Sequence, residues 1–397
     1  MTIRRASILA LLAVVSSIAF AQTKQPLNPI TVDCNSGQSL NSTLAKLNKQ
    51  GPNTVSVSGT CSEYVQVIGF ENLTLKGLPG ATLTQPTTGP GNLANGVLYI
   101  QSSRSVTVDG FSVQASLVNQ VTGAILIGHG SSDIRLRNSI VQGGTYGIFV
   151  FEHSQVSIAY VTSQDPAYGS LGVYDFSDVH VERSELKNSS GALWHVGMDI
   201  GASSVSVYDT RISNMQQGIT AHAGSSVAIA PFDAYYPSGG STDVTIENSA
   251  GTSYNGVAID GGGALNIQTA KLVINKPGQS WGGTTGGILL SDGANLISYA
   301  PNNLVITGSY GQGIVAVNNS HATLAGATVT NSLHGGLVVA NLSTIDVEGS
   351  TNGTLVSGNS VDLFCDSASW VTGTANISGS PTAQCANLLA TETVTLP

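Results

Sequence analysis

The stretch Gly147–Ile158 reads GIFVFEHSQVSI, and close versions of it recur along the chain. They read GITAHAGSSVAI at 218–229, GVAIDGGGALNI at 256–267 and GGLVVANLSTIDV at 335–347. In each copy, apolar and polar residues alternate on both sides of a short turn, which predicts two short β-strands. The usual step between copies is about 22–26 residues, a period typical of solenoid proteins.

One such unit has too few apolar residues to bury its own inner side, whereas stacked units bury it against each other. Stacking would align Ile148, Val150, Val156 and Ile158 with their counterparts above and below. A second break carries Asn, as at Asn138-Ser139, Asn188-Ser189, Asn248-Ser249 and Asn331-Ser332. Asn tolerates a left-handed backbone and suits such turns. The sequence therefore predicts an all-β fold, a right-handed parallel β-helix with about ten coils.

The composition fits strands and turns, and it limits the partners. Gly accounts for 47 of 397 residues and charged residues for only 9%. The formal net charge of −9 leaves no basic face, which argues against nucleic acid and anionic membrane surfaces as partners.

The N-terminus has the pattern of a secretory signal. Arg4 and Arg5 precede an apolar run, and Ala19-Phe20-Ala21 forms an A-x-A cleavage site. We expect a signal peptide at 1–21, a single β-helix domain at 22–397, and a secreted or periplasmic protein that does not insert into a membrane after cleavage. The alternative is a membrane anchor, for which the apolar run is short.

Both ends of the expected solenoid need protection, because a terminal coil exposes unpaired strand edges. Residues 36–48 carry Leu40, Leu44 and Leu47 at helical spacing, which predicts a short capping helix within an N-terminal cap of about 30–60. The last coil is expected at about 361–385. Four cysteines allow three pairings; the simplest is one local bridge at each end, Cys34–Cys61 and Cys365–Cys385.

These segments together resemble a known group of proteins. VDCNSGQSLNSTLAKLN, VSVSGTCSEYVQVIGFENLTLKG and the stacked GIxV…SxVxI coils are similar to the secreted right-handed β-helix proteins of the pectate-lyase-like superfamily. The resemblance covers nearly the whole mature chain. It implies the fold, and it implies activities that range from pectate and alginate lyases, polygalacturonases and uronan epimerases to phage tailspikes.

The candidate catalytic residues lie on the outward side of the first strand of each copy. Alternation places Phe151, Tyr174, His222 and Asp260 in one outward column, with Asp199 two residues back along its own strand. Adjacent coils are about 4.8 Å apart, so Asp199 and Asp260 would lie roughly 10 Å apart with His222 between them. Paired carboxylates are the acid and base of glycosidases, and histidine also acts as a base. The alternative is that all three are solvated polar groups.

Aromatic residues gather on the same middle coils, in part where the repeat carries insertions around 230–243 and 275–287. Aromatic side chains beside a groove suit stacking on sugar rings, and the alternative is that they pack loops onto the solenoid. The candidate substrate-binding residues are Tyr174, Trp194, Tyr235, Tyr236 and Trp281.

No complete catalytic motif of the resembling families is present. The chain has the Gly-His-Gly of polygalacturonases at 128–130 without their other motifs, and it lacks the Asp-Pro-His-Glu of alginate epimerases. Arg183 and Arg211, near Glu182, Glu185 and Asp209, would suit a calcium-dependent lyase without a recognised spacing.

The lead hypothesis is an exported protein that acts on or binds a polysaccharide in a groove on the middle coils. The alternatives are a non-catalytic glycan-binding, surface or structural protein, and a calcium-dependent polysaccharide lyase. We predict no metal-ligand set and no certain cofactor, with Ca²⁺ required only by the lyase alternative. The sequence does not define the oligomeric state.

Overall fold

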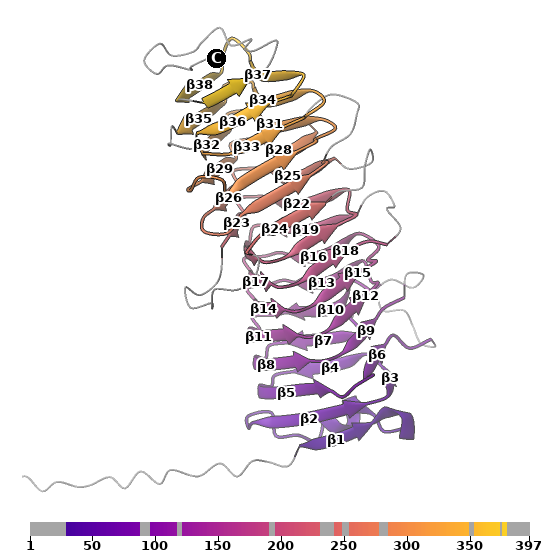
Figure 1. Cartoon of the computed structure of the whole chain (residues 1–397). Coiled ribbons are helices and arrows are strands. Elements are labelled where there is room, and N and C mark those ends of the chain that lie inside the picture. Colours follow the sequence, from indigo (N-terminus) through magenta and orange to yellow (C-terminus); the bar gives the residue numbers. More distant parts are fainter. Residues whose placement is uncertain are drawn as a thin grey trace, which may run out of the picture.

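The structure is a computed structural model, and it is a tall stack of short parallel strands (Figure 1). It describes residues 29–87, 96–116, 121–189, 195–230, 242–247, 254–277, 285–348, 353–373 and 375–378. All strand pairs in this part of the chain are parallel, and they form three long sheets.

We name the sheets A, B and C. Sheet A has 14 strands: β1 (Ile30–Asp33), β2 (Asn53–Ser58), β5 (Glu71–Gly77), β8 (Arg104–Asp109), β11 (Ser132–Arg137), β14 (Gln155–Ala159), β17 (Asp178–Glu182), β20 (Ser204–Tyr208), β23 (Ser226–Ile229), β26 (Ala264–Ile267), β29 (Asn295–Ser298), β32 (His321–Ala325), β35 (Thr344–Glu348) and β38 (Trp370–Gly373). Sheet B has 13 strands: β3 (Thr60–Ser62), β6 (Thr82–Thr84), β9 (Ser112–Gln114), β12 (Ile140–Gln142), β15 (Thr162–Gln164), β18 (Glu185–Lys187), β21 (Arg211–Ser213), β24 (Val244–Glu247), β27 (Leu272–Asn275), β30 (Leu304–Thr307), β33 (Thr328–Thr330), β36 (Thr354–Ser357) and β39 (Ala375–Ser378). Sheet C has 12 strands: β4 (Val65–Ile68), β7 (Leu98–Gln101), β10 (Gly123–Gly128), β13 (Tyr146–Val150), β16 (Gly169–Val173), β19 (Val196–Gly201), β22 (Gln217–His222), β25 (Asn255–Ile259), β28 (Gly286–Leu290), β31 (Gln312–Ala316), β34 (Gly335–Val339) and β37 (Val361–Cys365).

Each coil runs through sheets C, A and B in that order, so it contains three strands rather than the predicted two. The third strand is only three or four residues long, which is too short to show a clear alternation. The expectation of about ten coils was also low, because the first coils lack the glycine-led phrase from which the copies were recognised. The Asn-Ser pairs belong to two different turns: Asn138 follows a sheet A strand, and Asn331 follows a sheet B strand.

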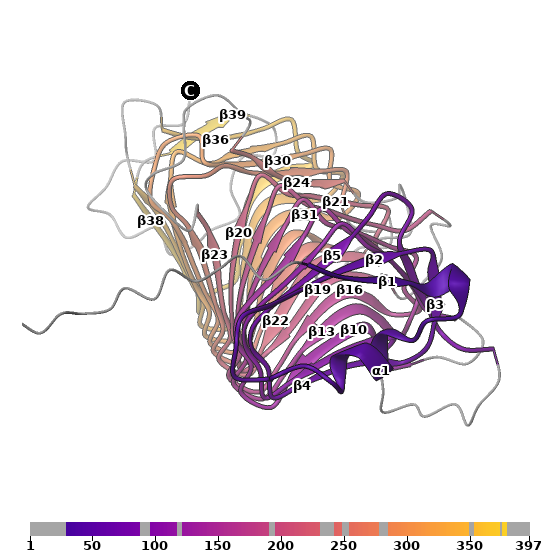
Figure 2. The same ribbon diagram turned by 90° about the horizontal axis from the view of Figure 1, so that it is seen from below.

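The interior is filled by columns of apolar side chains that stack in register from coil to coil. In sheet C, Ile148 pairs with Leu171, Leu171 with Met198 and Met198 with Ile219, and all four are fully buried. The predicted inward residues Val150, Val156 and Ile158 are likewise buried. Figure 2, viewed along the stack, shows the coils superposed around this core.

A column of buried serines links the coils at the turn between sheets C and A. The Ser103 hydroxyl accepts a hydrogen bond from the backbone N–H of Phe70 at 3.1 Å, and the Ser131 hydroxyl accepts one from Ser103 at 3.3 Å. The ladder resumes at Ser154, whose N–H donates to Ser177 at 3.1 Å, and continues to Ser203 and Ser225. Buried backbone N–H groups need such partners. Where the repeat carries this Ser, its hydroxyl therefore satisfies the backbone of the coil below it.

The glycine that opens most copies lies at the tight corner between sheets B and C. A Cβ at Gly287 would lie 2.5 Å from the Gly313 carbonyl oxygen and 2.6 Å from the Ile306 side chain. These distances are far below van der Waals contact, so the corner accepts only a residue without a side chain.

The N-terminal coil is completed by helices. The 3-10 helix η1 (Cys34–Ser36) follows β1, and α1 (Leu40–Leu44) lies beside β4 (Figure 2). The helix is shorter than the predicted 36–48, but Leu40 and Leu44 enter the core as expected. Glu63 accepts hydrogen bonds from the Leu40 N–H at 2.6 Å and from the Ser39 hydroxyl at 2.8 Å, which fixes the start of the helix.

The disulfide predicted at the N-terminal end is confirmed, since Cys34 is bonded to Cys61. Cys365 is also disulfide-bonded, and Cys385 lies outside the described residues. The expected last coil is present as β37, β38 and β39, one strand in each sheet. The signal peptide expected at 1–21 also lies outside the described residues. Among those that are described, no helix is long and apolar enough to cross a membrane.

The serine ladder gives a stability prediction. Ser103→Ala should lower the free energy of unfolding by about 1–3 kcal/mol, because it leaves the Phe70 N–H buried without a partner. Ser206→Ala, at an outward, half-buried position on β20, is the matched control and should change stability by less than about 0.5 kcal/mol. Urea unfolding followed by circular dichroism measures both, and equal effects would contradict the role of the ladder.

Candidate functional site

The register of sheet C confirms the predicted outward columns. Phe149 pairs with Gly172, Gly172 with Asp199, and Asp199 with Thr220. His222 pairs with Gly201, two residues after Asp199, as expected. Met198 and Ile200 on either side of Asp199 are fully buried, so the Asp199 side chain points away from the core.

Asp199 nevertheless has only 3% of its surface exposed, because tyrosines cover it. The hydroxyl of Tyr174, which directly follows β16 in the coil below, donates to Asp199 Oδ2 at 2.5 Å. The hydroxyl of Tyr146, from β13, donates to the same oxygen at 2.8 Å. Tyr168 completes the group, with its ring edge-on to Tyr146 at a centroid distance of 5.4 Å. One buried carboxylate thus organises tyrosines from two preceding coils.

His222 lies on the other side of this carboxylate. Its Nδ1 atom is 3.8 Å from Asp199 Oδ1, and its ring centroid is 5.9 Å from that of Tyr174. Its side chain is 34% exposed, so it is accessible from solvent.

Asp260 is further away. It follows β25, one coil beyond His222, and no hydrogen bond or ion pair among the described residues reaches its carboxylate. Two strand spacings and a two-residue offset separate the Cα atoms of Asp199 and Asp260 by about 12 Å. The structure therefore brings Asp199 and His222 together, whereas Asp260 lies beside His222 on the next coil and apart from Asp199.

The tyrosine hydroxyls are held in their protonated form. Burial raises the pKa of Tyr146, Tyr168 and Tyr174, and the negative charge of Asp199 and its hydrogen bonds raise it further. At neutral pH these three groups are hydrogen-bond donors, and they are poor general bases.

Aromatic rings continue from this cluster along sheet C. Tyr99 lies 6.2 Å from His129, His129 lies 5.4 Å from Phe151, and Phe151 lies 5.6 Å from Phe149. Phe149 is 5.5 Å from Tyr174, which contacts His222. Each ring is at least partly exposed. We call this row the aromatic stripe: Tyr99, His129, Phe151, Phe149, Tyr174 and His222.

A hollow adjoins the tyrosine cluster at the edge of sheet C, where Tyr168 forms part of its wall. It has a volume of about 410 Å³ and is lined by Tyr168, Val196, Gln216, Gln217 and Tyr254. The walls are aromatic, amide and aliphatic groups without a charge.

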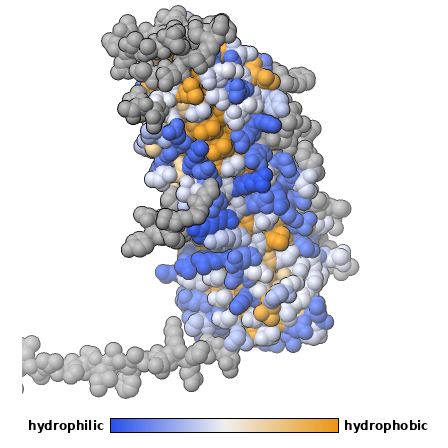
Figure 3. Space-filling model, viewed as in Figure 1, coloured by the Kyte–Doolittle hydropathy of each residue, from blue (hydrophilic) through white to orange (hydrophobic). Residues whose placement is uncertain are grey.

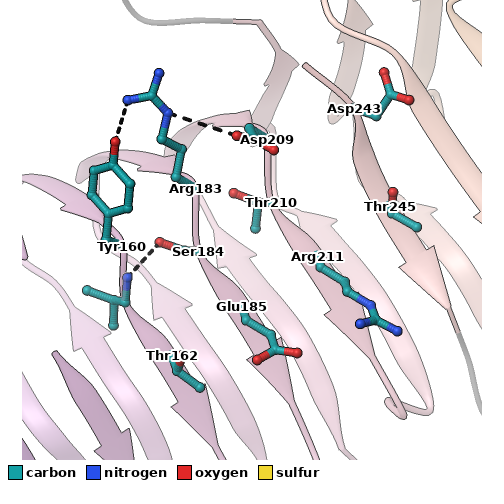
Figure 4. Close-up of a pocket in the computed structure, with 11 residues that line it drawn as sticks. Tyr160, Thr162, Arg183, Ser184, Glu185, Asp209, Thr210, Arg211, Asp243 and Thr245 are labelled. Carbon is teal, nitrogen blue, oxygen red and sulfur yellow. Dashed lines mark hydrogen bonds and ion pairs between the residues drawn. The ribbon is translucent and has the colours of Figure 1, made fainter. Parts of the chain in front are cut away.

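A second groove, of about 600 Å³, lies at the corner between sheets A and B (Figure 4). Here Arg183 donates to the Tyr160 hydroxyl at 2.6 Å and lies 3.9 Å from Asp209. Arg211 pairs with Glu247 at 2.5 Å. Burial raises the pKa of Asp209; the charge of Arg183 opposes this shift, and the charges of Asp243 and Glu182 add to it. Both arginines are therefore engaged by side chains of the chain itself, in contrast to the free cation that a uronate lyase needs.

Among the described residues, one group of metal-ligating types comes close together: Cys34, Cys61 and Glu63. Its two sulfurs are joined in the disulfide and offer no thiolate. No carboxylate cluster that would hold Ca²⁺ is found in this part of the chain.

Comparison with known families identifies the architecture. Residues 89–233, which contain the whole aromatic stripe and Asp199, match the family described as "Right handed beta helix region". The protein is a right-handed parallel β-helix. Comparison with the curated proteins and with the solved structures found no match.

The β-helix also contains a site residue that sequence reasoning missed. A strict alternation places Tyr146 on the inner side with Ile148. At the corner, however, a Cβ on Gly147 would meet the buried Ser163, so Gly147 and Ile148 both face inward and Tyr146 turns outward. The signal was the glycine itself, which marks the corner in each copy. Four of the predicted aromatic residues, Trp194, Tyr235, Tyr236 and Trp281, lie outside the described residues.

The charge of Asp199 can be tested through the tyrosines of the β-helix. Asp199→Asn should lower the pKa of Tyr146, Tyr168 and Tyr174, because it removes the negative charge that opposes phenolate formation. Alkaline titration of the phenolate ultraviolet absorbance measures this, with Asp260→Asn as the control. If the phenolate absorbance of Asp199→Asn and of the wild type rises identically at the highest pH values, Asp199 does not raise the pKa of these tyrosines.

The same pKa shifts predict how stability depends on pH. Because the folded-state pKa of these tyrosines lies above the unfolded value of about 10, the folded state holds their protons more tightly. The stabilisation is complete below about pH 10 and is lost as the pH rises towards the folded-state pKa values. The urea midpoint should fall more steeply above about pH 10 in the wild type than in Asp199→Asn.

Proposed function

We propose that this β-helix binds a polysaccharide along the aromatic stripe of sheet C. The observation that carries the proposal is the continuous row of partly exposed rings from Tyr99 to His222. It runs across six neighbouring strands, β7 to β22, and so extends about 24 Å along the stack. A row of this length suits a polymer that contacts several coils at once.

The buried Asp199 supports the proposal as a positioning residue. Its carboxylate fixes the hydroxyls of Tyr146 and Tyr174, and therefore the direction of the long axis of both rings. Rings held in place before the ligand arrives lose little conformational entropy on binding. Tyrosine combines an apolar face with a polar hydroxyl, which suits a ligand that has both.

The geometry gives less support to a glycosidase. The two carboxyl groups of an inverting glycosidase lie about 6.5–9.5 Å apart. The Cα atoms of Asp199 and Asp260 are about 12 Å apart, and the Asp199 carboxylate is covered by tyrosines, which leave only 3% of the residue exposed to a substrate or water. The protonated tyrosines also do not suit a lyase that takes a proton with a phenolate.

A second candidate function rests on one contact, the 3.8 Å approach of His222 Nδ1 to Asp199. A carboxylate that orients an exposed imidazole is an arrangement used in general base catalysis. His222 would then be the catalytic residue in a reaction on the bound polymer. A product screen separates the two candidates, since His222→Ala would abolish product formation.

We also propose that the protein works outside the cytoplasm. The signal-like N-terminus supports this, and the Cys34–Cys61 disulfide fits an oxidising compartment.

Tyr174→Ala tests the binding proposal. Loss of this ring should weaken binding about 5–30-fold, which corresponds to about 1–2 kcal/mol for a central aromatic contact. Affinity gel electrophoresis against a panel of neutral and uronic-acid polysaccharides measures the change.

Tyr299→Ala is the matched control, because Tyr299 is 58% exposed and follows a strand of sheet A. It should leave affinity unchanged. Binding to no polymer in the panel, or equal effects of the two substitutions, would refute the proposal.

A further inference from the structure

We infer that the polysaccharide bound along sheet C is uncharged; this rests on the proposed function and specifies its substrate class. The first observation is the distribution of cations. None of the twelve sheet C strands contains Lys or Arg. Between residues 85 and 270, the segments that connect sheet B strands to sheet C strands also contain no Lys or Arg. The sheet B strands in this range contain only Lys187 and Arg211. A uronate or sulfate group would therefore find no permanent positive charge on the sheet C strands themselves; the nearby cations are Lys49, which lines a hollow with Gln66, and Arg104, and both lie at the Tyr99 end of the stripe.

The second observation is that the ionised groups of this face are acidic. Asp199 lies beneath the stripe, and Glu152, Asp175 and Asp260 follow the sheet C strands β13, β16 and β25. The Glu152 carboxylate is 2.5 Å from His129, so the imidazole of His129 already has an acidic partner. An anionic polymer would therefore be repelled along the length of the stripe.

The third observation is the kind of polar group that remains. Beside the cluster, the Thr220 hydroxyl donates to the Gln217 side chain at 2.6 Å, and the adjoining hollow is lined by amide and phenol groups. Neutral donors and acceptors of this kind recognise hydroxyl groups, which are the polar groups of an uncharged sugar.

The cations are gathered on a different face. Arg135 and Arg137 line a groove of about 560 Å³ on sheet A, with Asp178 and Glu182. Figure 3, in the view of Figure 1, shows mainly hydrophilic surface over the sheet A strands labelled β11, β14 and β17. The scarcity of cations on sheet C is thus a property of that face, and the middle coils as a whole do contain arginine.

The test compares one polymer in three forms. The first probe is the neutral polysaccharide that binds best in the panel. The second is the same polymer with its C6 hydroxyls oxidised to carboxylates, and the third is the methyl ester of this oxidised form. Binding is measured at about pH 8, above the ordinary histidine pKa, with calcium and with chelator. We expect at least about tenfold weaker binding of the oxidised form and recovery with the ester, because the ester keeps the C6 carboxyl carbon and removes its charge.

A gain-of-function variant tests the same point from the protein side. Thr220→Lys adds a cation next to the Asp199 cluster and should strengthen binding of the oxidised polymer several-fold. Ser206→Lys, on the outward side of sheet A, is the control and should not.

The outcomes separate this inference from the proposed function. If no polymer binds, the proposed function fails. If the oxidised polymer binds as well as the neutral one, with or without calcium, while Tyr174→Ala still weakens both, the proposed function stands and the inference is overturned.

Discussion

Each coil hydrogen-bonds to the next so that equivalent positions of the two coils lie opposite each other. This constant register is the constraint on which the structure depends. It places like side chains in columns, inward and outward, along all three sheets. Backbone pairing alone does not define such a register, because a shift by one residue turns every side chain to the other face. The apolar columns, the serine ladder and the corner glycines each penalise that shift.

The fold was readable from the sequence because the columns repeat. Alternation around Ile148 and its counterparts predicted strands, stacking and the outward position of Asp199, and the structure confirms all three. The sheet B strands were missed for a physical reason. Three residues span less than two periods of alternation, so their pattern cannot be told from that of a turn.

The candidate site was less predictable, because it depends on departures from the repeat. Tyr146 reaches Asp199 only because Gly147 interrupts the alternation at a corner. The burial of Asp199 likewise depends on tyrosines that belong to earlier coils, about 25 and 53 residues away in the chain. A repeat pattern describes what the coils share, whereas this cluster is built from what individual coils do not share.

The number of stacked coils also sets the length of the stripe. Because each coil contacts mainly its two neighbours, the gain or loss of a whole coil leaves the others in place. Each inserted coil would lengthen the platform by about 4.8 Å without bending it away from the aromatic rings already there. A related chain could therefore match a longer or shorter stretch of polymer by duplication or deletion of one repeat, a change that a globular binding site cannot accommodate.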